Sequence, residues 1–318
     1  MAQLSVSMHP KLSEYIIERL HRRKISTVID FVLEDQEKLR IATDLSFKEI
    51  IDIKKYLIEQ FGGFIKKSSN LLKLEQINVT FTKIKSLDDL LQGGLYPGQI
   101  YEICGISSSG KTQLCLTIAS NIVLRSDNLV RYIDTKGDFF ASRMEMILRN
   151  KTYKEKEIEK AMEQIRITSA RNPYQLISIL QHMTNVLKLE NDFHTRALII
   201  DSLPGIIFKF SKDPEFNFIL NRLSSLCRFI ANEFYIPIVI VNLITQWSSS
   251  CDKGNAHSKE EAQKVVKPTL GKYWLHVPST RLLIEKLNND YRKVTIWKSY
   301  QMKMDSACNV KLAAAGII

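Results

Sequence analysis

The residues with the clearest chemical potential form one uninterrupted run, Gly105-Ile106-Ser107-Ser108-Ser109-Gly110-Lys111-Thr112. It fits the pattern G-x-x-x-x-G-K-[ST], in which the glycines let backbone N–H groups turn toward phosphate oxygens. An apolar segment, 99–104, precedes the run, and an amphipathic segment begins at Lys111, so we expect a strand, a loop and a helix. The N-terminus of such a helix favours an anion. The run therefore predicts a triphosphate-binding loop, against the alternative of a Gly/Ser turn that precedes a helix by chance.

Individual side chains in and beyond this loop are expected to hold a magnesium triphosphate. Lys111 is placed to reach the β- and γ-phosphates, and the Thr112 hydroxyl to ligate Mg²⁺. Ninety residues after Lys111, the apolar segment 197–201 ends in Asp201, which is predicted to hold Mg²⁺ directly or through a water. Asn242 ends the next apolar segment and is a candidate sensor of the γ-phosphate. A strand-end cap is an equally good interpretation of Asn242.

Apolar and amphipathic segments alternate from residue 87 onward. Strands are expected at 99–104, 130–134, 165–169, 197–201 and 236–241, and helices at 111–125, 139–149, 154–164, 172–190 and 215–234. Apolar strands between amphipathic helices indicate a mostly parallel α/β sheet covered on both faces. Two further β-type runs, 280–287 and 293–298, flank turn residues and are expected to form an antiparallel hairpin near the sheet edge.

Residues 1–61 show a different pattern, that of a small all-helical module. Apolar residues fall at helical spacing, and Ser46 with Glu49 three residues later fits a capping box. A Gly-Gly pair then ends the last helix, and a polar, Lys-rich stretch follows. We therefore predict a helical N-terminal domain at 1–61, a linker at 62–85 and a P-loop core at 86–318.

The charge of the chain divides in the same way. Lys and Arg number 45 against 34 Asp and Glu, a net charge of +11. Residues 1–61 hold ten basic and ten acidic residues, so the whole excess belongs to residues 62–318. A positive excess favours a polyanionic partner without identifying it. No apolar run approaches the ~18 residues of a membrane span, and five separated cysteines without a CxxC argue against a disulfide framework or a zinc ribbon.

The segments around the loop resemble the RecA-like recombinases of eukaryotes and archaea. The matching segments are 90–95, 98–103, 110–113 and 132–135. The chain order of helical domain, linker and ATPase core also matches that family. Within it the chain is most similar to the D-type paralogue of the strand-exchange recombinase. That similarity lies in Gly94-Leu95-Tyr96, Ala141-Ser142-Arg143 and the segment 270–281.

The resemblance implies ATP and Mg²⁺ as the ligands of the site. It places Gln113, directly after the loop, among the nucleotide-binding residues, together with every residue of the loop itself. It also places Arg143 near the adenine, where its guanidinium would stack on the base. A salt bridge on a helix surface is the alternative interpretation of Arg143.

Two departures from the family pattern bear on activity. Strand-exchange recombinases carry Thr-Glu-Gly after the second strand, where the Glu activates the attacking water, and this chain has Lys136 at that position. Glu102 and Asp138 are nearby in sequence, but neither sits at the motif position. Filament-forming members also place Phe-x-x-Ala in the linker, whereas this chain offers only Phe64-Ile65-Lys66-Lys67 and Phe81-Thr82-Lys83-Ile84. We therefore expect slow ATP turnover and pairing with non-identical paralogues.

Two loops of the family line the DNA path, and they correspond by position to residues 203–216 and 245–268. In the second, basic side chains are expected to contact phosphate, and Trp247 to stack on a base. The alternative is a solvated surface loop whose Trp packs on the core. The DNA-binding candidates are Trp247, Lys253, Lys259, Lys264 and Lys267.

Together with the phosphate loop, the resemblance implies an ATP-binding protein of homologous recombination in the nucleus. It would work as one subunit of a heteromeric paralogue complex that binds single-stranded or branched DNA and assists recombinase loading. An autonomous strand-exchange recombinase and an unrelated P-loop kinase are the alternatives. Lys136 and the missing Phe-x-x-Ala motif count against an autonomous recombinase. The absence of arginines from 245–268 counts against a kinase lid.

Overall fold

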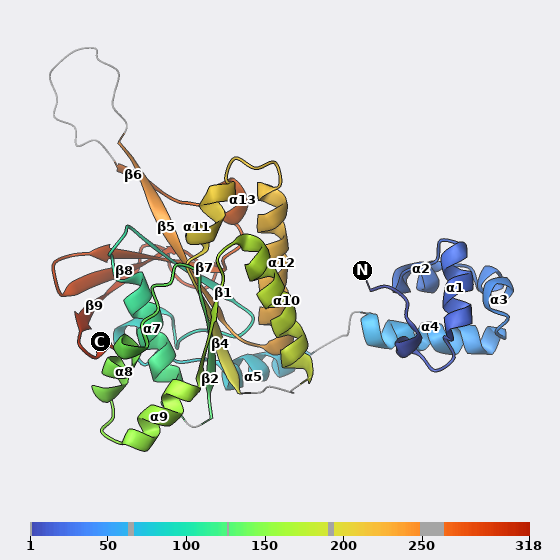
Figure 1. The fold of residues 1–318 in the computed structure, drawn as a ribbon, viewed down its shortest axis with the longest axis horizontal. Coiled ribbons are helices and arrows are strands. Elements are labelled where there is room, and N and C mark those ends of the chain that lie inside the picture. The colour runs from blue at the N-terminus through green and yellow to red at the C-terminus, as the bar shows by residue number, and fades with distance from the viewer. Residues whose placement is uncertain (1, 63–66, 126, 190–193, 249–263) are drawn as a thin grey trace, which may run out of the picture. The chain divides into compact units, whose positions relative to one another are not determined.

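The computed structural model describes residues 2–62, 67–125, 127–189, 194–248 and 264–318 (Figure 1). The chain divides into two compact units, Met1–Leu71 and Leu72–Ile318. Among the described residues, no helix combines the length and the apolar character needed to cross a membrane.

The N-terminal unit is a cluster of short helices with side-chain caps. Ser13 accepts a hydrogen bond from the Ile16 N–H at the start of the first helix, and Ser46 with Glu49 forms the expected capping box at the last. Its elements are η1 (Val6–Met8), α1 (Glu14–Arg22), α2 (Val28–Leu33), α3 (Gln36–Thr43) and α4 (Phe47–Phe61).

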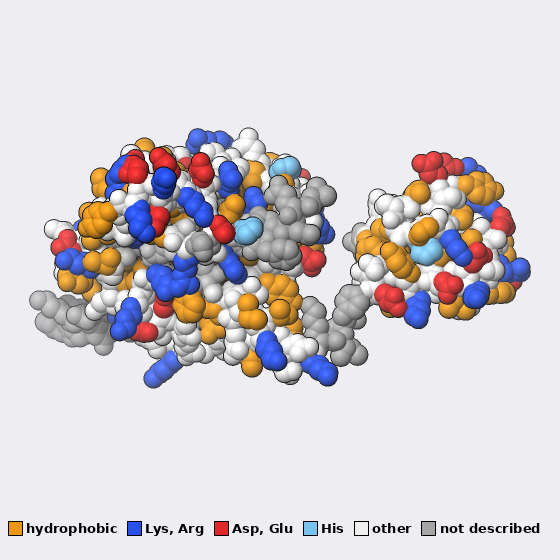
Figure 2. All heavy atoms as spheres, turned by 90° about the horizontal axis from the view of Figure 1, so that it is seen from below, with side chains coloured by type: hydrophobic (Ala, Val, Ile, Leu, Met, Phe, Trp, Pro, Cys, Tyr) orange, Lys and Arg blue, Asp and Glu red, His pale blue; other side chains and the backbone are white. Residues whose placement is uncertain are grey.

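One apolar core holds these helices together. Each helix turns its apolar stripe inward, which is the way short helices gain stability that they lack in isolation. The side chains with no exposed surface are Leu12, Leu20, Phe31, Leu39, Ala42, Ile50, Ile53 and Leu57. On the face that Figure 2 presents, acidic and basic side chains of this unit are intermingled, in keeping with its zero net charge.

The second unit is built on one sheet of ten strands. The strands run in the order β10-β9-β8-β7-β1-β5-β4-β2-β3, with β6 paired to β5 off this path. Neighbours among β7, β1, β5, β4, β2 and β3 are parallel, and the remaining pairs are antiparallel. The bounds are β1 (Ile100–Gly105), β2 (Leu129–Asp134), β3 (Ile165–Ser169), β4 (Thr195–Asp201), β5 (Ile238–Ser248), β6 (Lys264–Pro268), β7 (Thr280–Lys286), β8 (Tyr291–Lys298), β9 (Ala307–Ala313) and β10 (Gly316–Ile317).

Helices cover both faces of this sheet (Figure 1). One apolar core lies between the sheet and α7, α8 and α9, and a second lies between the opposite face and α10, α11, α12 and α13. Successive side chains of a strand point to opposite faces of the sheet, so those of the central strands alternate between the two cores. The helices are α5 (Ser68–Asn78), α6 (Lys85–Leu90), α7 (Lys111–Val123), α8 (Ala141–Arg149), α9 (Glu155–Glu163), α10 (Pro173–Leu189), α11 (Leu203–Ile207), α12 (Phe216–Phe234) and α13 (Gly271–Trp274), with the 3₁₀ turn η2 (Phe208–Phe210).

The structure corrects several details of the predicted elements. The segment 62–85, expected to be a polar connection, contains α5, a helix that buries none of its side chains. The strand expected at 236–241 continues to Ser248 and pairs with β6, so the ends of the segment 245–268 form a ribbon and not a loop. The segment 203–216 is likewise mostly helical, as α11 and η2.

The predicted antiparallel hairpin exists as β7 and β8, and two further strands lie between it and the end of the sheet. Strand β7 lies directly beside β1, and β9 and β10 extend the sheet beyond β8. The hairpin therefore stands close to the loop that follows β1.

Candidate phosphate-binding site

The carboxyl ends of four parallel strands bring the predicted site residues to one edge of the sheet. The glycine-rich loop follows β1, Asp134 ends β2 and Asp201 ends β4. In the register of the sheet, Asp134 lies beside Asp201, and Cys104 lies beside Asn242 of β5. This edge is where open parallel sheets bind their ligands.

The two glycines of the loop are demanded by its geometry. A side chain at Gly105 would come within 2.6 Å of the Ile284 carbonyl oxygen of β7. Gly110 has φ of 106°, a left-handed conformation that residues with a side chain rarely adopt, and helix α7 begins directly after it. Loop, helix start and neighbouring strand therefore form one rigid cradle at a helix N-terminus, a favourable place for an anion.

Lys111 folds over this cradle. Its side chain is buried, and its Nζ donates to the carbonyl oxygens of Gly105 at 3.0 Å and Ile106 at 2.5 Å. Burial, helped by the nearby positive charge of Lys136, lowers the pKa of Lys111 to about 8, against an opposing effect of Asp201. Because burial and Lys136 disfavour the charged form of Lys111, an anion bound beside the ammonium would stabilise that form.

Asp201 and Thr112 fit a divalent cation. The Asp201 carboxyl is buried, and its Oδ2 accepts a hydrogen bond from the Tyr132 hydroxyl at 2.9 Å, whereas its Oδ1 is buried without a hydrogen-bond partner. Burial raises the pKa of this carboxyl, and the neighbouring Thr112 and Tyr132 hydroxyls oppose that rise. A buried carboxylate oxygen without a partner beside a hydroxyl is a donor set that suits Mg²⁺.

The turn after β2 places Lys136 beside the cradle. The Asp134 carboxylate accepts hydrogen bonds from the backbone N–H groups of residues 136, 137, 138 and 139, which fixes the turn. Lys136 Nζ lies 4.0 Å from Asp138 Oδ2. Both side chains line the same cavity as Lys111 and Thr112. The lysine thus stands where the family motif places its glutamate.

Asn242 and Glu102 belong instead to a buried polar network. The Asn242 amide donates to Glu102 Oε1 at 2.7 Å, and its oxygen accepts from the Leu243 N–H and the Thr269 hydroxyl. Glu102 also accepts from Trp274 Nε1 at 2.8 Å and is ion-paired with Arg281. Contact between Asn242 and a phosphate would require these bonds to break, so its assignment as a sensor stays a prediction. Glu102 is fully buried and committed to its partners, which removes it as a candidate base.

Arg143 lies beside the predicted nucleotide residue Gln113. Its Nε donates to Gln113 Oε1 at 2.9 Å, and its two Nη atoms donate to the carbonyl oxygens of Ala314 at 2.9 Å and Ala313 at 3.1 Å. The guanidinium therefore joins α7 to the β9–β10 turn, in place of the surface salt bridge considered from the sequence. Stacking on a base stays a prediction.

One residue of the site escaped the sequence analysis. The cavity at the loop, about 290 Å³, is lined by Arg292 of β8 and by seven of the predicted residues, which are Ser107, Ser108, Gly110, Lys111, Thr112, Gln113 and Lys136. A signal was present: β8 buries alternate residues, and Arg292 occupies the same inward phase as Val294 and Ile296. A charged residue in an apolar phase marks a position with a special partner.

The predicted DNA-binding residues are placed only in part. Trp247 lies on β5 opposite Val265, and Lys264 and Lys267 lie on β6. The Lys267 side chain is exposed. Lys253 and Lys259 lie outside the described residues. So do Phe64, Ile65 and Lys66 of the first segment that was compared with the Phe-x-x-Ala motif.

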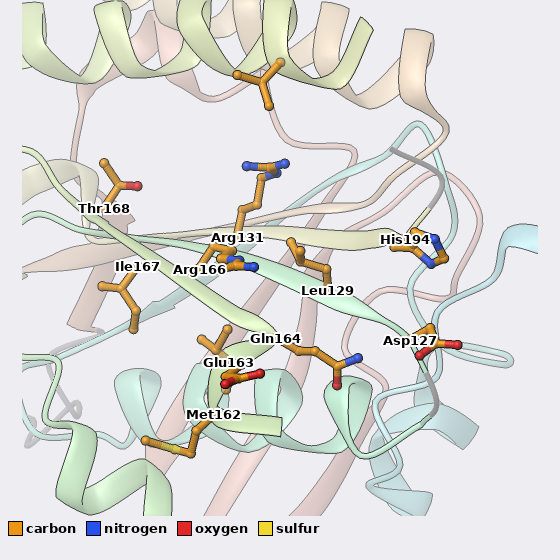
Figure 3. A pocket seen from close by; sticks show the side chains of 12 residues that line it. Asp127, Leu129, Arg131, Met162, Glu163, Gln164, Arg166, Ile167, Thr168 and His194 are labelled. Carbon is orange, nitrogen blue, oxygen red and sulfur yellow. The ribbon is translucent and has the colours of Figure 1, made fainter. Parts of the chain in front are cut away.

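A larger cavity, about 870 Å³, lies elsewhere in the core unit. It is at the amino ends of β2, β3 and β4, opposite the phosphate loop, where Asp127, Gln164 and His194 line it. Figure 3 shows these side chains together with Arg131 and Arg166, which are paired in the register of β2 and β3. The cavity has no phosphate loop, so we do not assign the nucleotide to it.

Comparison with known protein families agrees with the motifs. A family model described as Rad51 matches residues 73–318, and one described as RAD51D, N-terminal domain, matches residues 1–60. The crystal structure of the RadB recombinase superposes with a TM-score of 0.58 at 22% identity, covering 75% of this chain and 98% of that one. The predicted fold and the predicted resemblance are both confirmed.

Curated relatives give the same result. DNA repair protein RAD51 homolog 4 of Bos taurus is 27% identical over 328 residues, covering 99% of this chain and 97% of the relative. The Mus musculus protein of the same name is 28% identical, covering 94% and 91%. DNA repair protein RAD51 homolog 2 of Homo sapiens is 25% identical, covering 91% and 82%.

Proposed function

This chain belongs to the Rad51 family, as a paralogue of DNA repair and recombination, and from that premise we propose that it is an ATP-binding subunit of a heteromeric paralogue complex. In this proposal the complex works in the nucleus and helps the recombinase to load on single-stranded DNA. The observation that carries ATP binding is the cradle of Gly105, Gly110 and Lys111 beside the unpartnered Asp201 oxygen.

The residues of the cradle have separate tasks in holding Mg-ATP. Backbone N–H groups of the loop would bind phosphate oxygens, and Lys111 would move from the loop carbonyls to the β- and γ-phosphates. Thr112 and Asp201 would hold Mg²⁺, which supplies neutralisation of the phosphate charge. Tyr132 keeps the Asp201 carboxylate oriented through its hydroxyl hydrogen bond.

Slow hydrolysis follows from Lys136. A lysine ammonium cannot accept a proton from the attacking water, and its positive charge stabilises the bound triphosphate instead. Asp138 is the carboxylate that remains in the cavity, and it faces Lys136 at 4.0 Å. We therefore propose tight ATP binding with slow turnover, and expect Asp138→Asn to leave the low turnover unchanged.

A partner surface is supported at strand β3. This strand ends the sheet within the described residues, and four of its five residues are exposed. An edge strand offers unpaired backbone N–H and C=O groups to a strand from another chain. We propose that an extended segment of a non-identical paralogue pairs here, beside the cavity of Figure 3.

The nucleotide part of this proposal is tested by binding of ATP to purified protein with Mg²⁺. Lys111→Ala should abolish most ATP binding. Lys151→Ala is a matched control, because burial also lowers the pKa of Lys151 to about 8, but its Nζ bonds Ser120 and Asn121 on α7. Equal affinity of the Lys111→Ala variant and the native protein would show that the loop is not the site.

The partner part is tested by capture of the tagged chain and identification of its companions by mass spectrometry. Other recombinase paralogues are expected, and Arg166→Glu on β3 should lose one of them. Electron micrographs with ATP provide the second observation. Discrete small oligomers are expected, and long regular filaments of this chain alone would favour an autonomous recombinase instead.

A further inference from the structure

Arg292 is a buried cation that the phosphate-binding motif does not include. It lies on β8, far from the loop in sequence, and only 4% of its surface is exposed. Its Nε donates to the Ser109 carbonyl oxygen of the loop at 2.9 Å. Its Nη1 donates to three carbonyl oxygens at the β7–β8 turn, those of the turn residues Asn288 at 2.8 Å and Asn289 at 3.1 Å and that of Tyr291, the first residue of β8, at 3.0 Å.

These four bonds make Arg292 a rigid connection between the β7–β8 turn and the loop. A guanidinium is planar and presents its donors in a fixed fork, so bonds at one end of the fork orient the other end. Three carbonyl groups of one turn hold the Nη1 end. With the Nη1 end held, the Nε–H also points at one fixed place, which is the Ser109 carbonyl.

Fixing this carbonyl also fixes the next amide of the loop. The peptide between Ser109 and Gly110 is trans, since the cis bond found in the described residues is Asp201-Ser202. In a trans peptide the C=O and the N–H point in opposite directions. When Arg292 holds the Ser109 oxygen toward β8, the Gly110 N–H must point away from β8. Gly110 has φ of 106° and no side chain, so the Ser109–Gly110 peptide plane is free to rotate if nothing holds it.

We propose that Arg292 is a positioning residue of the phosphate-binding loop, which holds the Gly110 amide in the orientation that binds a nucleotide phosphate. The inference rests on the proposed binding of ATP by this loop. It adds a strand residue to a site otherwise made by the loop and the helix after it. It also connects the exposed β7–β8 turn to nucleotide affinity through one side chain.

A direct contact with the γ-phosphate is the competing role, because Arg292 lines the same cavity as Lys111. The two roles differ in the phosphate they affect. Loop amides cradle the α- and β-phosphates, which ATP and ADP share. A positioning residue therefore acts on both nucleotides equally, whereas a guanidinium that touches the γ-phosphate acts on ATP alone.

The experiment measures the affinities of ATP and ADP, with Mg²⁺, for the full chain and three variants. Arg292→Met should weaken both nucleotides by roughly ten-fold and by the same factor, since hydrogen bonds to a charged group are removed. Arg292→Lys keeps a cation and should recover part of the loss. Lys293→Met is the control, because it removes a charge from the next position of β8, whose side chain points to the other face.

The outcomes separate cleanly. Unchanged affinities in Arg292→Met overturn the inference, and so does a loss confined to ATP. If Arg292→Met fails to fold, as judged by circular dichroism, the Arg292→Lys variant replaces it. A smaller but equal loss of affinity for ATP and ADP then supports the inference, and unchanged affinities or a loss confined to ATP overturn it. Failure of the native protein to bind either nucleotide would refute the proposed function itself, which is a different result from native binding that Arg292 does not affect.

Discussion

At the scale of single residues, Lys111 is a buried cation whose charged form is disfavoured by its surroundings. Burial and Lys136 lower its pKa to about 8, from an ordinary value of 10.5. Anionic phosphate beside the ammonium acts in the opposite direction and raises the pKa. Below pH 8 the lysine is already protonated, and above pH 8 binding must be accompanied by proton uptake. The affinity for nucleotide is therefore linked to pH through this one group.

We expect ATP affinity to be nearly constant from pH 7 to 8 and to fall as the pH rises further, approaching ten-fold per unit. Titration calorimetry at several pH values, in two buffers of different ionisation enthalpy, measures both the affinity and the proton uptake. The Lys151→Ala variant should keep the native slope. The prediction is wrong if the native protein shows no proton uptake at pH 9.

Part of the site could be predicted from the sequence, because it depends on residues that are close together in the chain. The loop, Lys111 and Asp201 follow one another in a pattern of strand, turn and helix that neighbouring residues determine. The inward phase of Arg292 could be read from the sequence, but its partner could not, because that contact depends on the tertiary pairing of β7 with β1. Asn242 was expected to end a strand, but it lies inside β5, and the sequence does not reveal that Glu102 and Thr269 use its amide.

At the scale of elements, the central strands were predictable and the outer ones were not. Strands β1, β2, β4 and β5 are near-continuous apolar runs, because helices cover both of their faces. Strand β9 exposes or half-exposes most of its residues and has no such run. Helix α5 buries none of its side chains, and Asn78 at its end accepts a hydrogen bond from Arg196 of β4, a contact invisible in the sequence.

The Glu102–Arg281 pair joins the middle of β1 to the amino end of β7. Glu102 of β1 and Arg281 of β7 are neighbours in the register, and both side chains are buried. Removing one member of a buried pair leaves the other charge buried without a partner, which lowers the free energy of unfolding strongly. The pair therefore stabilises the pairing of β7 with β1, the strand that leads into the loop, and it does so next to Asn242 and Trp274.

Glu102→Gln should lower the free energy of unfolding by about 3–5 kcal/mol. Urea denaturation followed by circular dichroism measures the change. Glu145→Gln is the matched control, since its partner Arg149 is an exposed residue four positions along α8, and such pairs contribute less than about 1 kcal/mol. Equal losses in the two variants would contradict the buried-pair assignment.

At the scale of the whole molecule, the excess positive charge lies in one module. Residues 1–61 are neutral, and residues 262–318 hold ten basic against three acidic residues. If the positive charge serves DNA binding, that binding must release counterions and weaken with salt, with a slope of about 0.7 per phosphate contact for single strands. The charge of the N-terminal module should not matter for this slope.

We expect the affinity for single-stranded DNA to fall steeply with salt concentration. Changing Lys253, Lys259, Lys264 and Lys267 together to Gln should flatten the logarithmic slope, by up to roughly 3 if all four contact phosphate. Fluorescence anisotropy of a labelled oligonucleotide measures it. Four Gln substitutions at Lys24, Lys38, Lys48 and Lys55 of the N-terminal module give the control at equal charge loss. A flat response in the native protein would show that the charge does not serve DNA.

The two units also make separable contributions to assembly. The N-terminal helices have their own apolar core, and the loop, Lys111 and Asp201 all lie in the second unit. Removal of residues 1–61 should therefore leave ATP affinity within about two-fold, while one protein partner is lost from pull-downs. A deletion that ends at residue 61 keeps α5 and its Asn78–Arg196 contact, whereas a deletion to residue 78 removes both and should also lower the unfolding temperature. If the shorter deletion retained every partner, the helical module would have no role in assembly, and a loss of ATP binding in that fragment would mean that the two units are not independent.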